Sequence, residues 1–284
     1  MALPATPPDK MSFWEHLSEL RMRIIRSLLI VIGAFTFTYG FPFGLQDISG
    51  MQLFGVHPFY FFKGMPPFRF LLWTWAKKPF LEAMAHQTGK AIGDLQPFAF
   101  TNLAEPFFSL MRLSLWASAL LAAPFLFDQV WAFIRPGLMP KERRLVIPFV
   151  FITTACFLGG VSFAYLKAFG FLGDILFQEA AAAGLRANLH ASDYLDLFIY
   201  TTLLTGAMFE LPVLFYFLAR FRLVTARWML KYWRQASAII VIFSALFTPG
   251  DVILTAIFFS VVLLGLYFIS VVVAWIAEPR RPKE

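Results

Sequence analysis

Residues 13–26 read FWEHLSELRMRIIR, and this stretch decides how the rest of the chain folds. Its apolar residues recur at helical spacing, and Glu15 and Glu19 lie four residues apart on one helix face. Three arginines follow before a long apolar run, a pattern that marks the cytoplasmic end of a membrane span. We therefore predict that residues 12–23 form an amphipathic helix at the inner membrane surface. Ser12 is a suitable N-cap for this helix.

The composition is that of a membrane protein. Of the 284 residues, 59% are hydrophobic and only 14% are charged. A soluble domain cannot bury so much apolar surface, and several apolar runs reach the roughly 20 residues that span a bilayer. The net charge of +7 is distributed as membrane orientation requires, which argues against nucleic-acid binding. Cys156 is the only cysteine, so neither an intrachain disulfide nor a cysteine metal cluster is expected.

We predict an all-α polytopic protein with six transmembrane helices and both termini in the cytoplasm. The predicted spans are residues 24–41, 107–134, 145–169, 194–219, 236–247 and 252–276. The short basic loops at 135–144 and 220–234 support this orientation, because Lys and Arg gather on the cytoplasmic side. Residues 1–11 are expected to form a disordered tail. Residues 42–105 are expected to form a long outer loop, and 170–193 an outer connection with a short Ala-rich helix.

Four prolines are expected to bend helices and to shape a concave bundle. They are Pro79, Pro106, Pro124 and Pro212. The last belongs to the segment FELP at 209–212, in which Glu210 lies deep within a predicted span. An ionised acid at that depth is costly without a polar partner. Glu210 is therefore predicted either to bond to a neighbouring span or to dock a partner helix.

Catalytic and metal-binding motifs are absent from the sequence. It contains no phosphate-binding Gly-rich loop, no nucleophile elbow and no His-Glu-x-x-His pair, and its four histidines are scattered. We expect no metal, no cofactor and no enzymatic activity. A secondary transporter would need several polar groups at mid-membrane, where only Glu210 is predicted to lie. A scaffold that docks proteins through acids at its inner surface fits the sequence better.

The segment HLSELRMR at residues 16–23 resembles the N-terminal signature of the TatC family, the multispanning receptor of twin-arginine protein translocases. Further similar motifs follow in family order and cover most of the chain. They are EPFF at 105–108, QVWAF at 129–133, PGL at 136–138, ERR at 142–144, FELP at 209–212 and TPGD at 248–251. Three departures are a longer first outer loop, VILT after Asp251 in place of a frequent Ser-Gln pair, and Tyr267-Phe268 where many relatives have an acid.

The resemblance implies a receptor in the inner (cytoplasmic) membrane that binds the Arg-Arg signal peptides of folded precursors. It also implies single-span partners, TatA and TatB, export driven by the protonmotive force, and contact with membrane lipids. Self-association is expected as well. We assign signal-peptide binding to Glu19, Glu142, His16 and Arg21, and contact with a partner helix to Glu210, Gln129 and Asp251.

Residue types alone leave local explanations open for these positions. Glu19 lies four residues before Arg23 and could form only an intrahelical ion pair. Glu142 follows Pro140 and could serve only the dipole of a first helical turn. Arg21 could orient Glu19 or contact a lipid phosphate.

Overall fold

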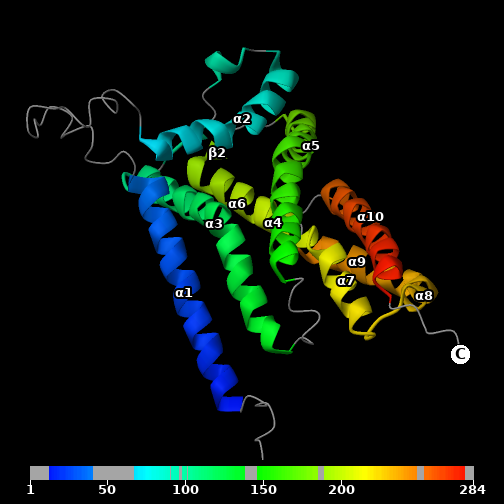
Figure 1. The fold of residues 1–284 in the computed structure, drawn as a ribbon. Helices are drawn as coiled ribbons and strands as arrows, with labels where there is room; N and C mark the ends of the chain where they lie inside the picture. The colour runs from blue at the N-terminus through cyan, green and yellow to red at the C-terminus, as the bar shows by residue number, and fades with distance from the viewer. Residues whose placement is uncertain are drawn as a thin grey trace, which may run out of the picture.

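The computed structural model describes residues 13–40, 67–89, 91–95, 98–100, 102–137, 146–184, 189–247 and 253–278. Most of these residues lie in helices, and Figure 1 shows long helices side by side with α2 across one end. The helices are α1 (Phe13–Gly40), α2 (Phe68–Thr88), α3 (Glu105–Ile134), α4 (Val146–Phe163), α5 (Phe169–Ala182), α6 (Ala191–Met208), α7 (Leu211–Arg220), α8 (Ala226–Lys231), α9 (Trp233–Phe247) and α10 (Ile253–Ala277). The predicted tail at 1–11 lies outside the described residues.

Short elements complete the described chain. Two 3-10 turns, η2 (Ile92–Asp94) and η3 (Arg135–Gly137), precede and follow α3, and the π-helix η5 (Ala164–Ala168) joins α4 to α5. Strands β1 (Phe98–Ala99) and β2 (Leu189–His190) pair in parallel over two residues each. This pair connects the segment before α3 to the segment before α6, and the fold is otherwise all-α.

Each of the six predicted spans overlaps helical structure in the described residues, and the fourth overlaps two helices, α6 and α7. Within the described residues, α3, the continuous helix Val146–Ala182, α6 with α7, and α10 are long and apolar enough to cross a membrane. Helix α9 is apolar but shorter. Helix α1 begins with charged turns and continues as an apolar helix to Gly40.

The structure differs from the sequence pattern in the length of three helices. Residues 13–23 do not form a separate surface helix, because α1 continues without a break into the first predicted span and residues 13–32 contain no Gly or Pro. The third predicted span continues through η5 into α5, which makes a helix of 37 residues. Helix α2 forms inside the segment 42–105, which the sequence marked only as an outer loop.

The four prolines have different structural roles. Pro79 and Pro124 lie inside α2 and α3, where each removes one backbone hydrogen bond. Pro212 lies in the first turn of α7, directly after the turn at 209–210 that separates α6 from α7. Pro106 lies in the first turn of α3, where a proline starts a helix without bending it. The predicted bend at Pro106 is therefore wrong.

The largest group of buried side chains lies near α2. It joins α2 to α3, η5, α5 and α6, and its ring contacts include Trp116 against Phe198 at 5.0 Å between centroids. The hydroxyl of the buried Tyr194 donates to the Ala76 carbonyl at 2.6 Å, which fixes α6 against α2. The indole N–H of Trp116 donates to Thr202 at 2.9 Å, which fixes α3 against α6. These buried polar bonds make α2 an integral part of the bundle.

Two glycines allow α4 and α6 to touch through their backbones. A Cβ atom at Gly160 would lie 2.6 Å from the Thr205 carbonyl oxygen, and one at Gly206 would lie 2.7 Å from the Phe157 ring. Both distances are far below van der Waals contact, so no larger residue fits without moving a helix. Small residues at such crossings let membrane helices pack closely.

We predict that Gly160→Ala destabilises the protein, because the added methyl group meets backbone atoms that cannot rotate away. Overpacking of this kind costs about 1–3 kcal/mol. The measurement is the melting temperature of the detergent-solubilised protein. Gly159→Ala is the matched control, because a Cβ atom at Gly159 meets nothing within 4 Å. Equal melting temperatures for the two variants would contradict the close α4–α6 contact.

Candidate functional site

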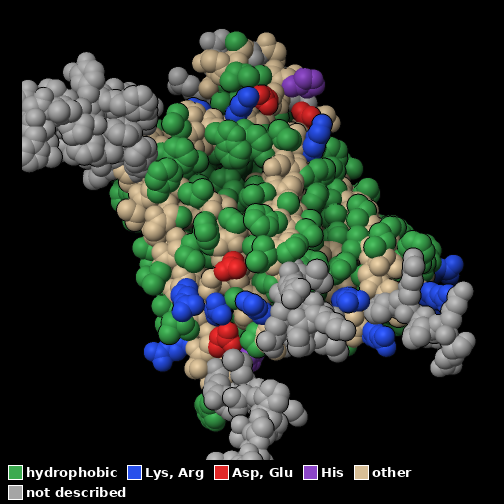
Figure 2. Space-filling model, viewed as in Figure 1, with side chains coloured by type: hydrophobic (Ala, Val, Ile, Leu, Met, Phe, Trp, Pro, Cys, Tyr) green, Lys and Arg blue, Asp and Glu red, His purple; other side chains and the backbone are tan. Residues whose placement is uncertain are grey.

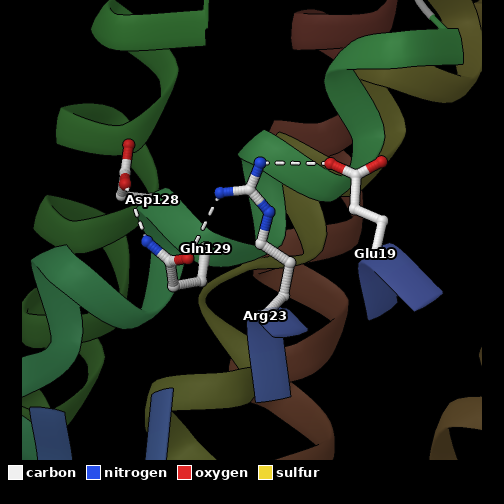
Figure 3. Close-up of polar contacts among 4 residues, drawn as sticks. All are labelled: Glu19, Arg23, Asp128 and Gln129. Carbon is white, nitrogen blue, oxygen red and sulfur yellow. Dashed lines mark hydrogen bonds and ion pairs between the residues drawn. The ribbon is translucent and has the colours of Figure 1, made fainter. Parts of the chain in front are cut away.

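The charged residues of α1 meet α3 at one end of the bundle. Arg23 forms an ion pair with Glu19 one turn earlier, at 3.1 Å, and its other terminal nitrogen donates to Gln129 Oε1 at 3.3 Å. Gln129 in turn donates to Asp128 Oδ2 at 3.1 Å. Figure 3 shows this chain of contacts, in which Arg23 lies between the acid of α1 and the amide of α3. We call these four residues the Glu19 cluster.

Only half of the Glu19 carboxylate is paired in this cluster. Its Oε1 atom accepts from Arg23, whereas its Oε2 atom is enclosed and has no hydrogen-bond partner among the described residues. The Glu19 side chain is 18% exposed, so it is sheltered but still reached from the surface. A carboxylate oxygen in such a place is costly unless a donor reaches it. Glu19 is therefore suited to accept a hydrogen bond from an incoming cation.

Arg23 connects Glu19 of α1 to Gln129 of α3. The intrahelical pair with Arg23, one of the two explanations that the sequence left open, is present. Gln129 holds the second arm of the Arg23 guanidinium, which directs that group toward α3. The i, i+4 spacing predicted the pair of Glu19 with Arg23, but sequence reasoning missed the contact of Arg23 with Gln129 and that of Gln129 with Asp128.

The other assigned residues of the α1 signature flank this cluster. The His16 ring stacks on Phe133 of α3 with 4.4 Å between centroids, which fixes the first turns of α1 against the end of α3. Arg21 and Arg26 are exposed. His16 and Arg21 are both exposed, and their assignment to signal-peptide binding remains a prediction.

Two of the assigned residues lie outside the described residues. They are Glu142, between η3 and α4, and Asp251, between α9 and α10. Their assignments remain predictions from the sequence. Gln129, which was assigned to partner-helix contact, is also part of the Glu19 cluster through its bond to Arg23, and its assignment remains a prediction.

Glu210 occupies a separate place, at the turn between α6 and α7. Its Oε1 atom is enclosed and has no hydrogen-bond partner among the described residues. Its neighbour Phe209 packs on Phe163 of α4 with 5.5 Å between ring centroids. Pro212 has no backbone N–H and cannot donate a backbone hydrogen bond. The amide of Leu214 donates to the Glu210 carbonyl at 2.9 Å, so Glu210 directly precedes the first turn of α7. Glu210 therefore sits at a helix break within the fourth predicted span.

Two polar contacts join α3 to the α6 region. Arg112 of α3 forms an ion pair with Asp196 of α6, and Glu105 accepts from the Ser192 hydroxyl at 2.7 Å. These contacts lie near the start of both helices, at the end of the bundle where α2 lies. The sequence showed Arg112 in a span but gave no partner for it. Within the described ranges, no group of three or more His, Cys, Asp or Glu could hold a metal ion.

Many cationic side chains gather at one end of the molecule. Figure 2 shows Lys and Arg side chains in a band across the lower part of the visible face, with acidic side chains among them. This band includes the level at which α1 begins and α3 ends (Figures 1 and 2). We call it the basic end, and the Glu19 cluster lies there. The broad surface between the two ends is predominantly apolar in this view.

Fold and site together define a polytopic helical membrane protein with a partly paired carboxylate at its basic end. The model of the family described as Sec-independent protein translocase protein (TatC) matches residues 15–261. The protein of that name from Desulforapulum autotrophicum is 32% identical over 276 residues, covering 97% of this chain and 88% of its own. Its counterpart from Koribacter versatilis is 29% identical, with 96% and 89% covered. The chain belongs to the TatC family.

The solved structures agree with this assignment. The crystal structure of the twin-arginine translocase receptor TatC matches with a TM-score of 0.69 and 22% identity, covering 93% of this chain and 99% of that one. A second crystal structure of the receptor, in the detergent DDM, matches with a TM-score of 0.65. The predicted all-α, six-span architecture is confirmed, and the chain is a TatC-family component of a protein translocase.

Proposed function

We propose that the chain is the receptor subunit of a twin-arginine translocase and binds Arg-Arg signal peptides of folded precursors. The observation that carries this proposal is the Oε2 atom of Glu19, enclosed and without a partner at the basic end. A guanidinium offers several N–H donors in one plane and forms charge-assisted bonds with carboxylates. An arginine of the signal peptide completes the pairing that Arg23 leaves unfinished. Glu142 is proposed to receive the second arginine.

Arg23 prepares Glu19 for this role. Because Gln129 draws the Arg23 guanidinium toward α3, Arg23 contacts Glu19 through one nitrogen only. The carboxylate is thereby oriented while its Oε2 atom stays without a partner. His16 fixes the helix that carries Glu19, through its contact with Phe133, and the exposed Arg21 is proposed to orient the peptide or to contact a lipid phosphate.

We further propose that partner helices dock at Glu210. The Glu210 carboxyl group has a backbone hydrogen bond from Phe157 of α4, whereas its Oε1 atom has no described partner and can accept a bond from an external donor. In the low dielectric of a membrane, a polar residue on the helix of TatA or TatB stabilises this acid by hydrogen bonding. Peptide capture at the basic end and assembly at Glu210 would then precede transport driven by the protonmotive force. Asp251 is a further candidate for partner contact, and several copies are expected in the active complex.

Both termini are proposed to lie in the cytoplasm, with the chain in the inner membrane. The band of Lys and Arg at the basic end supports this orientation, because short cationic segments stay on the cytoplasmic side. The same orientation makes the Glu19 cluster reachable by precursors before export. Helix α2 then lies on the outer side.

The orientation can be tested with a reporter that is active only outside the cytoplasmic membrane. Fusions at Gly89 or Gly184 should be active, since these positions follow α2 and α5 on the proposed outer side. Fusions at Met139 or Thr225 should be inactive. An active fusion at Met139 would contradict the proposed orientation.

The receptor role predicts that Glu19→Lys abolishes crosslinking to a twin-arginine signal peptide. The substitution removes an acceptor and places a cation against the incoming arginine, which adds repulsion to the lost pair. Crosslinking is measured with the purified, detergent-solubilised protein, and Glu142→Lys should give the same loss. The melting temperature of each variant shows whether it is folded.

The exchange of Glu19→Arg with Arg23→Glu is a matched control for the intrahelical explanation. This double variant keeps an i, i+4 ion pair and the net charge, but moves the carboxylate by one turn. If Glu19 serves only helix α1, the double variant should crosslink like the unchanged protein. We expect it to fail as Glu19→Lys does.

The docking role of Glu210 predicts a different pattern. Glu210→Ala should weaken crosslinking of the TatA or TatB helix to the fourth span and reduce transport, yet leave peptide crosslinking at Glu19 unchanged. Glu210→Gln should keep part of the transport activity, because an amide can still form a hydrogen bond. A fall in the melting temperature of Glu210→Ala before any partner is added would instead support an internal bond.

A further inference from the structure

A pocket of about 300 Å³ opens at the end of the bundle opposite the Glu19 cluster. It lies between α2 on one side and the continuous η5–α5 helix on the other. The polar residues that line it are Lys78, Glu82 and His86 from α2, with Tyr165 from η5 and Asp174 from α5. The volume is within the range of about 300–1,000 Å³ that small-ligand sites occupy. No residue assigned from the sequence lies in this pocket except Pro79.

The packing of α2 on α5 explains how the pocket stays open. A Cβ atom at Gly173 would lie 2.8 Å from the Cβ of Ala83, so the two helices touch at that level. Less than one turn earlier, Gly170 has nothing within 4 Å of its Cβ position and leaves the space empty. Tyr165 is fixed beside this space, because its ring stacks on Trp75 at 4.0 Å and its hydroxyl donates to the Trp75 carbonyl. The pocket is thus held by rigid contacts on both sides.

The pocket carries charges of both signs that do not satisfy each other. The Oδ1 atom of Asp174 is enclosed and has no hydrogen-bond partner among the described residues. Lys78 and Glu82 lie 3.7 Å apart and are both more than half exposed, which makes a weak pair. Figure 2 shows cationic, anionic and histidine side chains together near this end of the molecule. A ligand with one cationic and one anionic group matches this arrangement.

The depth of the pocket places it at the level of lipid headgroups. At about 1.5 Å per residue, Tyr165 lies about 30 Å along the helix from Val146, and Asp174 lies about 40 Å along it. The hydrocarbon core of a bilayer is about 30 Å thick, and the headgroups extend the total to about 40–45 Å. If the hydrocarbon begins near Val146, the helix leaves it near Tyr165, and the headgroup layer on that side, about 5–8 Å deep, lies between the levels of Tyr165 and Asp174. Leu166, which also lines the pocket, is 69% exposed and offers an apolar surface on the membrane side.

We propose that this pocket binds the headgroup of a phospholipid that carries a primary ammonium group. The ammonium donates to Asp174 and Glu82, the lipid phosphate accepts from Lys78, and an acyl chain lies along Leu166. A primary ammonium has N–H donors for the unpaired Asp174 oxygen, whereas a trimethylated choline has none. An anionic headgroup without an ammonium would bring its charge against two carboxylates. Such a lipid would join α2 to α5 and stabilise the end of the bundle opposite the Glu19 cluster.

The test measures which phospholipids stay bound to the intact chain in native mass spectrometry. Phosphatidylethanolamine, phosphatidylcholine and phosphatidylglycerol with identical acyl chains are added in equal amounts to the delipidated, detergent-solubilised protein. We expect phosphatidylethanolamine to be retained preferentially. Asp174→Asn should weaken its retention by about tenfold, because the amide keeps an acceptor oxygen but loses the negative charge that strengthens the bond to an ammonium group.

Matched variants separate the pocket from general effects of charge and folding. Glu179→Gln removes an exposed acid from the same helix outside the pocket and should leave retention unchanged. Gly170→Leu extends a side chain into the open space, where a Cβ atom meets nothing within 4 Å, and should abolish preferential retention, while the melting temperature without lipid stays near that of the unchanged protein. If Asp174→Asn does not fold, Glu82→Gln tests the same contact.

Two results would overturn the proposal. One is equal retention of phosphatidylcholine or phosphatidylglycerol by the unchanged protein, which would exclude recognition of the ammonium. The other is unchanged retention of phosphatidylethanolamine by Gly170→Leu, which would place the lipid elsewhere on the surface. Neither result depends on signal-peptide binding, so the lipid site and the proposed receptor role fail or succeed separately.

Discussion

The constraint on which this structure depends is that lipid offers no hydrogen bonds to a protein backbone. Every backbone N–H and C=O within the hydrocarbon must therefore be satisfied inside the chain, and helices are the simplest solution. The described irregular backbone follows the same rule. The π-helix η5 is packed against α5 and α6, and the turn before α7 is covered by α4 through Phe209 and Phe163. Breaks in these helices occur where neighbouring helices protect them.

For the same reason, an enclosed carboxylate oxygen without a hydrogen-bond partner is energetically costly. Among the described residues, enclosed carboxylate oxygens without a partner belong to Glu19, Asp174 and Glu210. They occur at three levels: the basic end, the end where α2 lies, and the break within the fourth predicted span. By contrast, Arg112 and Asp196 satisfy each other across α3 and α6. The three incomplete carboxylates mark the places where the protein offers bonds to other molecules, which we propose are a signal peptide, a lipid and a partner helix.

Rigid packing connects these three levels. The close contact of Gly160 with Gly206 holds α4 to α6, and the buried bonds of Tyr194 and Trp116 hold α6 to α2 and α3. Helix α3 in turn carries Gln129, which directs Arg23 at the basic end. The carboxylates are therefore presented by one packed framework, and each is oriented before a ligand arrives. Such preorganisation reduces the entropy that binding must overcome.

The sequence by itself determined the membrane class, the six spans, the family and the positions of Glu19 and Glu210. These features are local, because hydropathy and i, i+4 spacing are read along one segment. Tertiary structure alone decided that α1 is continuous, that α2 packs into the bundle, and that the helix of the third span continues beyond that span to Ala182. It also decided the contacts between Arg23 and Gln129, and between Trp75 and Tyr165, which join residues far apart in the chain. Such contacts depend on how helices pack against each other, and no periodicity within one helix specifies its neighbour.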